Sequence, residues 1–169
     1  MHPLISILLS VFASIVLILF VMRHFAMKRL LAVWDEISEL YRQKVDTIPA
    51  LVETMRHHVA EKKSLDMITR LHREGVLIPS QDFIDILEMN IRIQKEFLFL
   101  MKLSAHIPSL QTNTHFIYMR NFIIDAEKGI RWKFDALNEK IRAYNNFLTL
   151  KNFTLIGMGI PGKKYPPIH

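Results

Sequence analysis

The stretch "WDEISELYRQKVDTIPALVETMRHHV" (residues 34–59) decides how this chain folds. Its apolar residues recur every three or four positions, the spacing that places side chains on one face of an α-helix. The line consists of Trp34, Ile37, Tyr41, Val45, Ile48, Val52, Met55 and Val59. Pro49 stands inside this line, although a proline in a helix interior costs about 3 kcal/mol. Because the line keeps its phase past Pro49, we predict one long helix over about residues 25–74, bent at the proline and braced by its neighbours. The alternative is a helix that restarts with Thr47 as its N-cap.

Upstream, residues 4–22 read "LISILLSVFASIVLILFVM", without a charge or a proline. As a helix this run is about 28 Å long, close to the thickness of the bilayer core. A cleaved signal peptide is the alternative, but it needs a basic leader and a small-residue cleavage site, and only "MHP" precedes the run. We therefore predict an uncleaved membrane anchor over residues 1–24. Arg23, Lys28 and Arg29 follow the span, so the positive-inside rule places the rest of the chain in the cytoplasm and the N-terminus outside.

Two further helical segments follow a turn at residues 73–82. Residues 82–105 are apolar nearly all round, which indicates either the central helix of a bundle or a face used for self-association. Residues 114–152 carry a regular line of Phe116, Met119, Ile123, Ala126, Ile130, Phe134, Leu137, Ile141, Tyr144 and Leu148. The fold class is therefore all-α, with a single membrane helix followed by a long antiparallel three- or four-helix bundle over residues 25–156. The glycine- and proline-rich tail, residues 157–169, packs on the bundle, enters the membrane interface or contacts a neighbour.

Composition and motifs argue against catalysis and against nucleic-acid binding. The chain has no cysteine, no acidic residue with a histidine three positions later, and no phosphate-binding loop. His57 with Glu53 or Glu61 has metal-ligand spacing, but no second cluster completes a site, so we predict no metal, cofactor or catalytic residue. The net charge is +6, with a basic excess between Lys128 and Lys164. This excess favours either contact with membrane lipid or a solvated helix face, and no nucleic-acid motif accompanies it.

Asn138 and Asn145 are seven residues apart, each one position after an apolar seam residue. Such asparagines either hydrogen-bond between helices and fix their register, or face solvent. The pattern alone leaves both interpretations open.

The chain resembles the LemA family of bacterial membrane proteins in three places. The first is the tryptophan-led helix, through Trp34, Asp46, Ile48, Pro49, Leu51, Val52 and Glu53. The second is the turn "IPSLQTNTHF", through Pro108, Leu110, Asn113 and Phe116. The third is "EKGIRWKFDALNEKIRAYNNFL", through Glu127, Ile130, Asn138, Tyr144 and Asn145. Departures from the family pattern occur at Thr47, Ala50, Arg120, Phe134 and Leu137.

The resemblance implies a membrane-anchored helical bundle with no established catalysis, located in the bacterial inner membrane. A relative that takes part in magnetosome formation points toward membrane shaping. We therefore expect a homo-oligomeric scaffold that organises or remodels membrane, with lipid as a partner. The alternative is a membrane-tethered adaptor or signalling component that docks another, unidentified protein on the same apolar surface.

Overall fold

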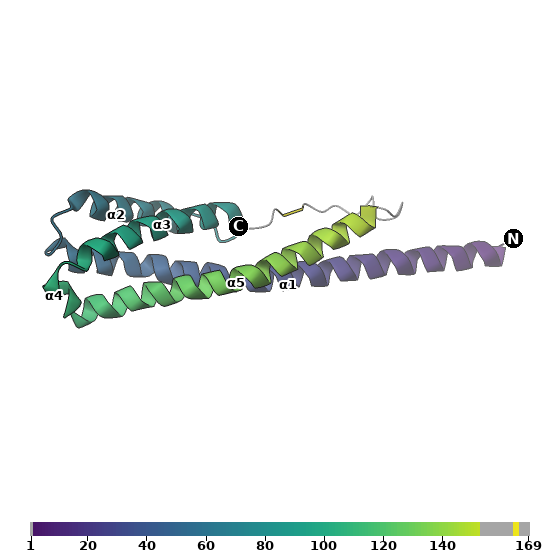
Figure 1. Ribbon diagram of the computed structural model, residues 1–169. Helices are drawn as coiled ribbons and strands as arrows, with labels where there is room; N and C mark the ends of the chain where they lie inside the picture. Colours follow the sequence, from purple (N-terminus) through teal and green to yellow (C-terminus); the bar gives the residue numbers. More distant parts are fainter. Residues whose placement is uncertain (1, 153–163, 166–169) are drawn as a thin grey trace. The chain divides into compact units, whose positions relative to one another are not determined.

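The computed structural model describes residues 2–152 and 164–165. Five helices follow one another along the chain (Figure 1): α1 (His2–Arg56), α2 (Lys62–Val76), α3 (Phe83–Ser104), the single turn α4 (Pro108–Gln111) and α5 (Thr114–Asn152). The described residues contain no strand, which confirms the all-α class. The chain forms two compact units, unit 1 with Met1–Trp34 and Lys133–His169, and unit 2 with Asp35–Trp132.

Unit 2 is a bundle of four helical segments: residues 35–56 of α1, α2, α3 and residues 114–132 of α5. Each helix places one apolar face in the core, as amphipathic helices do. The fully buried core side chains include Ile37, Ile48, Leu51 and Met55 from α1, Ile68 from α2, Ile93, Phe97 and Leu100 from α3, and Phe116, Ile123 and Ile130 from α5. The sequence allowed a bundle of three or of four helices, and unit 2 is a bundle of four.

Helix α1 continues through Pro49, as predicted. The alternative start at Thr47 is wrong, because the Thr47 hydroxyl donates to the Gln43 carbonyl at 2.8 Å, one turn back within the same helix. Pro49 is exposed, while its neighbours Ile48 and Leu51 are buried. The bend expected at Pro49 stays a prediction.

The prediction of one helix up to residue 74 is wrong, because α1 ends at Arg56 and α2 begins at Lys62. The amide groups of His58 and Val59 both donate to the Met55 carbonyl at 2.9 Å, which closes the last turn. Val59, in the connection between α1 and α2, is still buried. The apolar line therefore runs past the end of α1 and does not show where the helix ends. No glycine or proline marks this break in the sequence.

Helix α5 spans Thr114–Asn152, the segment predicted from its apolar line. Asn113 stands at its N-cap, where its Oδ1 accepts a hydrogen bond from the Phe116 amide at 3.0 Å. An asparagine at this position satisfies one of the free amides of the first turn. The turn before α5 contains α4, whose first residue is Pro108, a favoured place for proline.

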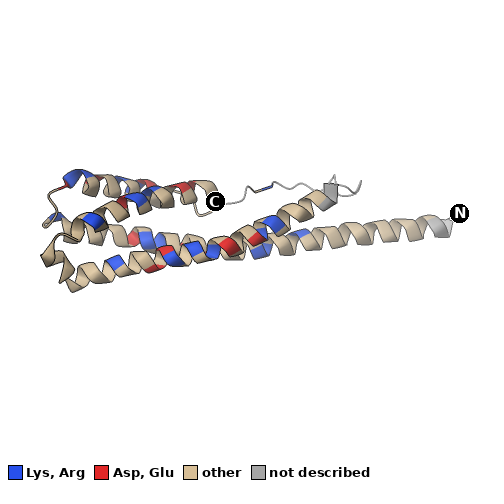
Figure 2. Cartoon of the chain, in the orientation of Figure 1, with Lys and Arg blue, Asp and Glu red and all other residues tan. Residues whose placement is uncertain are grey.

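Unit 1 contains the apolar start of α1, which carries no charged residue before Arg23 (Figure 2). This helix is long and apolar enough to cross a membrane, and none of its most apolar window is buried by protein. Further along unit 1, Leu30 and Trp34 are buried, as are Leu137, Ile141, Tyr144 and Leu148 of α5. The predicted boundary at residues 24 and 25 stays a prediction. The boundary at 156 and 157 lies outside the described residues, as does the tail apart from Lys164 and Tyr165.

Candidate functional site

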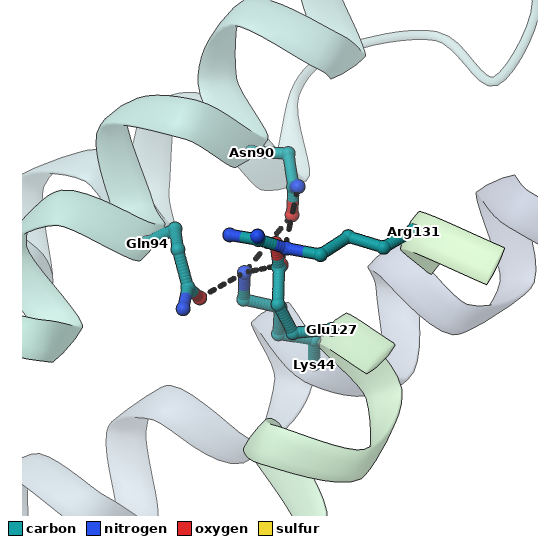
Figure 3. Close-up of polar contacts among 5 residues, drawn as sticks. All are labelled: Lys44, Asn90, Gln94, Glu127 and Arg131. Atoms are coloured by element: carbon teal, nitrogen blue, oxygen red, sulfur yellow. Dashed lines mark hydrogen bonds and ion pairs between the residues drawn. The ribbon is translucent and has the colours of Figure 1, made fainter. Parts of the chain in front are cut away.

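The most concentrated polar site in unit 2 surrounds Lys44 of α1, whose side chain is completely buried. Its Nζ atom donates to Oε2 of Glu127 at 2.7 Å, to Oδ1 of Asn90 at 3.0 Å and to Oε1 of Gln94 at 3.0 Å (Figure 3). Three donated bonds match the three hydrogens of an ammonium group, so this geometry fits the charged form of Lys44. The three acceptors come from α3 and α5, and one side chain thereby joins three helices.

Glu127 of α5 is the centre of charge in this network. Its Oε2 also accepts from Nδ2 of Asn90 at 3.3 Å, and its Oε1 accepts from Nε of Arg131 at 3.0 Å. The Arg131 side chain is largely exposed, so it closes the network toward solvent. Both carboxylate oxygens are therefore occupied by donors, as a buried carboxylate requires.

The pKa values of the pair follow from burial and from the contacts. Burial lowers the pKa of Lys44, against the opposing effect of the Glu127 charge. Burial alone raises the pKa of Glu127, but the Lys44 charge and the hydrogen bonds from Lys44, Arg131 and Asn90 outweigh it, so the net pKa is lowered. Glu127 is thus held ionised, and the pair is an ammonium–carboxylate pair.

This network suits a structural role better than a chemical one. The Nζ atom of Lys44 is enclosed by Asn90, Gln94 and Glu127, and the whole side chain has no solvent exposure. A nucleophilic lysine needs access to its substrate, which this site lacks. A buried ion pair is weak evidence for added stability, and we interpret this one as a contact that fixes how the helices pair.

Sequence analysis missed Lys44, Asn90 and Gln94, although a signal was present. Lys44 lies between Tyr41 and Ile48 at the three- and four-residue spacing of the buried face, and Asn90 lies three residues before the buried Ile93. A charged or amide residue in register with an apolar line indicates a buried polar contact. Glu127 was identified, but only through the family resemblance.

The other residues singled out by the sequence are distributed over both units and do not form one site. Most of them are core residues: Trp34, Ile48, Leu51, Val52, Phe116, Ile130 and Tyr144 are buried. Glu53 is exposed on α1, 3.7 Å from Arg56 and 4.0 Å from His57. Within the described residues no group of three or more histidine, cysteine or acidic side chains is placed to hold a metal ion.

The spacing left open whether Asn145 bonds to a neighbouring helix or faces solvent, and in the structure its partner is the backbone of Tyr165. Its Nδ2 donates to the Tyr165 carbonyl at 2.7 Å, and its Oδ1 accepts from the Tyr165 amide at 3.1 Å. The rings of Tyr144 and Tyr165 lie 5.9 Å apart. The Asn145 amide therefore holds the backbone of Tyr165 against α5. Asn138 is half-buried.

A cavity of about 300 Å³ lies in unit 2 between α1, the end of α2 and the start of α3. Its lining residues are Ser38, Tyr41, Arg42, Val45, Asp46, Gly75, Val76, Ile78, Ser80 and Ile86. The Tyr41 hydroxyl is buried and has no hydrogen-bond partner among the described residues, and burial raises the pKa of Tyr41 to about 12. A Cβ at Gly75 would lie 2.6 Å from this hydroxyl, so only glycine fits there without a shift.

Helix α3 presents a second, exposed face in addition to its buried one. Ile84, Ile91 and Leu98 are 56%, 63% and 50% exposed, and Phe99 beside Leu98 is 45% exposed. Ile86, Ile93, Phe97 and Leu100 of the same helix are buried. The structure confirms α3 as a core helix of the bundle that also has an uncovered apolar face, and the use of that face for self-association stays a prediction.

Comparison with known proteins agrees with the fold and with the motifs. No curated protein matches the chain. The model of the LemA family matches residues 33–155, which include all of α2 to α5 and the part of α1 that carries Pro49. This match covers most of the chain and includes Lys44, Asn90 and Glu127. The protein belongs to the LemA family, and its apolar N-terminal helix fits a membrane-anchored helical protein.

Proposed function

We propose that this protein is a single-pass membrane protein whose helical bundle self-assembles into a scaffold on the membrane. The anchor is the apolar start of α1, and the assembling surface is the exposed apolar face of α3. The proposal assigns it no catalysis and no cofactor. Lipid is its membrane partner, and further copies of the chain are its protein partners.

The observation that carries the proposal is the exposure of Ile84, Ile91 and Leu98 on a helix that already fills its place in the core. Each of these side chains is at least half exposed, and covering such a residue stabilises an assembly by roughly 1–2 kcal/mol. These residues share one face of α3 at seven-residue spacing, and a group of exposed apolar residues on one face indicates an interaction surface, whereas single exposed apolar residues are ordinary.

The anchor would hold copies of the α3 face in one membrane. Arg23, Lys28 and Arg29 follow the apolar run, which supports an inner-membrane protein of a bacterium with the bundle on the cytoplasmic side. Copies held in one membrane meet at a high effective concentration, so a weak face becomes sufficient for assembly. An array of anchored bundles would organise or bend the membrane that holds it.

The experiment is to purify the full-length protein in mild detergent and measure its mass by light scattering over a range of concentrations. We expect oligomers that dissociate on dilution, and a shift to monomer in Ile91→Glu. The matched control is Met67→Glu, because Met67 is an exposed apolar residue, 44% exposed, that belongs to α2 and not to α3. A protein that is monomeric at every concentration, in detergent and in lipid, would overturn the proposal.

Membrane organisation is tested separately by reconstituting the protein into vesicles and imaging them by cryo-electron microscopy. We expect ordered patches or changed curvature with the wild type and smooth vesicles with Ile91→Glu. If cross-linking in native membranes instead captures a stoichiometric second protein on the α3 face and no further copies, the protein is an adaptor rather than a scaffold.

A further inference from the structure

The cavity of about 300 Å³ in unit 2 has the size and the lining of a binding site for a small molecule. Its volume is at the lower end of the range for such sites. Its wall consists of residues 38–46 of α1, the end of α2, and residues 78–86, which lead into α3. The cavity is therefore large enough for a molecule the size of one amino acid, and the side chains around it decide which molecule fits.

Two opposite charges line this cavity from α1. Arg42 and Asp46 are four residues apart, so their side chains project from the same side of the helix. Both are exposed, and neither forms an ion pair or a hydrogen bond with the residues that the structure describes. Asp46 acts on His72 of α2 through its charge alone. One positive and one negative group thus lie beside the cavity without a counter-charge in contact.

The Tyr41 hydroxyl adds a third polar group to the wall. Tyr41 is 3% exposed, and its hydroxyl has no hydrogen-bond partner within the described part of the chain. A buried hydroxyl without a partner is destabilising, so its presence calls for an explanation. Because burial raises the pKa of Tyr41 to about 12, the hydroxyl keeps its proton at neutral pH and can donate a hydrogen bond. It lies against Gly75, which lines the same cavity.

From this arrangement we propose that the cavity binds a small α-amino acid with an apolar side chain. Arg42 pairs with the carboxylate of the ligand, which also accepts a hydrogen bond from the Tyr41 hydroxyl, and Asp46 pairs with its ammonium group. The Tyr41 hydroxyl is covered by its neighbours, so the wall moves slightly when the ligand reaches it. The apolar side chain of the ligand packs on the apolar lining residues, Val45, Val76, Ile78 and Ile86.

The two charges favour a zwitterion over the other classes of small molecule. A phosphate or a dicarboxylate would be repelled by Asp46, and a cation without an acid group would be repelled by Arg42. A purely apolar molecule would leave both charges and the hydroxyl without a partner. In an amino acid the carboxylate and the ammonium group are bonded to the same carbon, so one molecule reaches both side chains of the same helix turn, and guanidinium–carboxylate pairs are strong contacts.

The test is calorimetric titration of the full-length protein in mild detergent with three probes: glycine, L-valine and L-leucine. We expect the affinity to rise from glycine to leucine, by roughly threefold for each carbon atom that is buried. The absence of binding for all three probes at millimolar concentration would overturn the proposal. An affinity that is equal for the three would overturn the part assigned to the apolar lining.

Variants combined with truncated ligands identify which group binds which. Arg42→Gln and Asp46→Asn should each weaken leucine binding about tenfold. The amine 3-methylbutylamine is leucine without its carboxylate, and 4-methylpentanoate is leucine without its ammonium group. In Arg42→Gln the amine should bind no worse than leucine, because the partner of the carboxylate is already absent. In Asp46→Asn the same should hold for 4-methylpentanoate.

Tyr41→Phe separates binding from stability. The variant should be more stable than the wild type, because it removes an unpaired hydroxyl, and should bind leucine about fivefold more weakly. A tyrosine with a merely structural role would not combine higher stability with weaker binding. Unchanged affinity in Tyr41→Phe would overturn the part assigned to the hydroxyl.

The matched controls are Arg142→Gln and Asp66→Asn, which make the same changes of charge on exposed residues outside the cavity. Both should bind leucine as the wild type does. Leucine binding that these controls weaken as much as Arg42→Gln and Asp46→Asn do, or that none of the four variants changes, would place the ligand elsewhere and overturn the site. The proposed self-assembly is measured separately by light scattering, so the failure of either proposal leaves the other standing.

Discussion

The Nζ atom of Lys44 lies 2.7 Å from Oε2 of Glu127, and this ion pair joins α1 to α5 inside unit 2. Asn90 and Gln94 of α3 complete the coordination of the ammonium group. A shift in the register of these helices would move Lys44 away from its partners and leave a buried charge unpaired. We infer that the network favours this arrangement of helices over others that apolar faces alone would allow.

Replacing Lys44 by methionine should destabilise unit 2 by about 3–5 kcal/mol, because it leaves the Glu127 carboxylate buried without its main partner. The measurement is the free energy of unfolding of the full chain in mild detergent, followed by circular dichroism. The double variant Lys44→Met/Glu127→Met should be more stable than Lys44→Met, since it removes the unpaired charge. Lys128→Met is the control, because Lys128 is an exposed lysine paired with Asp125, and a loss as large as that of Lys44→Met would contradict the account.

Acid should weaken the network through Glu127. Its pKa in the folded protein is lowered from the ordinary value of 4.5, so its stabilising contribution is fully present above pH 4.5 and is lost as the pH falls through the folded pKa. We expect the melting temperature of the wild type to fall more steeply with acid than that of Glu127→Gln, which has no carboxyl group to protonate at this position. Parallel melting curves of the two proteins against pH would contradict the assignment.

Tyr41→Phe should raise the free energy of unfolding by about 1 kcal/mol relative to the wild type. The reason is that the Tyr41 hydroxyl is buried without a partner among the residues that the structure describes, and an unmade hydrogen bond of this kind costs about 1–3 kcal/mol. Tyr118→Phe is the control, since Tyr118 is 67% exposed and its hydroxyl reaches water. A clear loss of stability in Tyr41→Phe would mean that the hydroxyl has a partner, such as an ordered water in the adjoining cavity.

Gly75→Ala should be destabilising, and the same substitution in the Tyr41→Phe background should cost less. The added Cβ lies 2.6 Å from the Tyr41 hydroxyl and 3.3 Å from Cγ of Met89, so removing the hydroxyl removes the closer contact. The quantity to measure is the coupling free energy of the double-mutant cycle. Additive effects of the two substitutions would show that the two groups do not meet.

Asn145→Leu should release Tyr165 from α5 and leave the helix itself folded. The change removes both hydrogen bonds to the Tyr165 backbone, so the Tyr165 amide should exchange with solvent much faster. Hydrogen exchange read by mass spectrometry measures this directly. Asn146→Leu, at the neighbouring exposed position, should leave the exchange of Tyr165 unchanged, and equal protection in all three proteins would contradict the contact.

Periodicity was sufficient to predict the long helices. The apolar line over residues 114–152 gave the bounds of α5, and the line through residue 49 gave a helix that passes Pro49. Both predictions rest on many buried side chains acting together, and such a pattern outweighs a single unfavourable residue. The break between Arg56 and Lys62 was missed because the buried Val59 extends the same line into the connection.

The polar contacts were harder to predict, because their partners are distant in the sequence. Lys44 and Glu127 are 83 residues apart, and only the folded bundle brings them together. Asn145 was recognised as an unusual residue, but its partner at Tyr165 lies in a segment with no helical pattern. A polar residue in an apolar line thus indicates that a contact exists, and the structure identifies which residue makes it.

The most direct test of the central claim, that the anchored chain associates with copies of itself, is energy transfer between labelled copies in lipid vesicles. Lys63→Cys, at an exposed position of α2, carries the donor or the acceptor dye, and transfer is followed as the protein-to-lipid ratio is raised. The account predicts transfer well above that of randomly placed anchors, lost when Ile91→Glu is added. Transfer no greater than random proximity at every ratio, unchanged by Ile91→Glu, would contradict it.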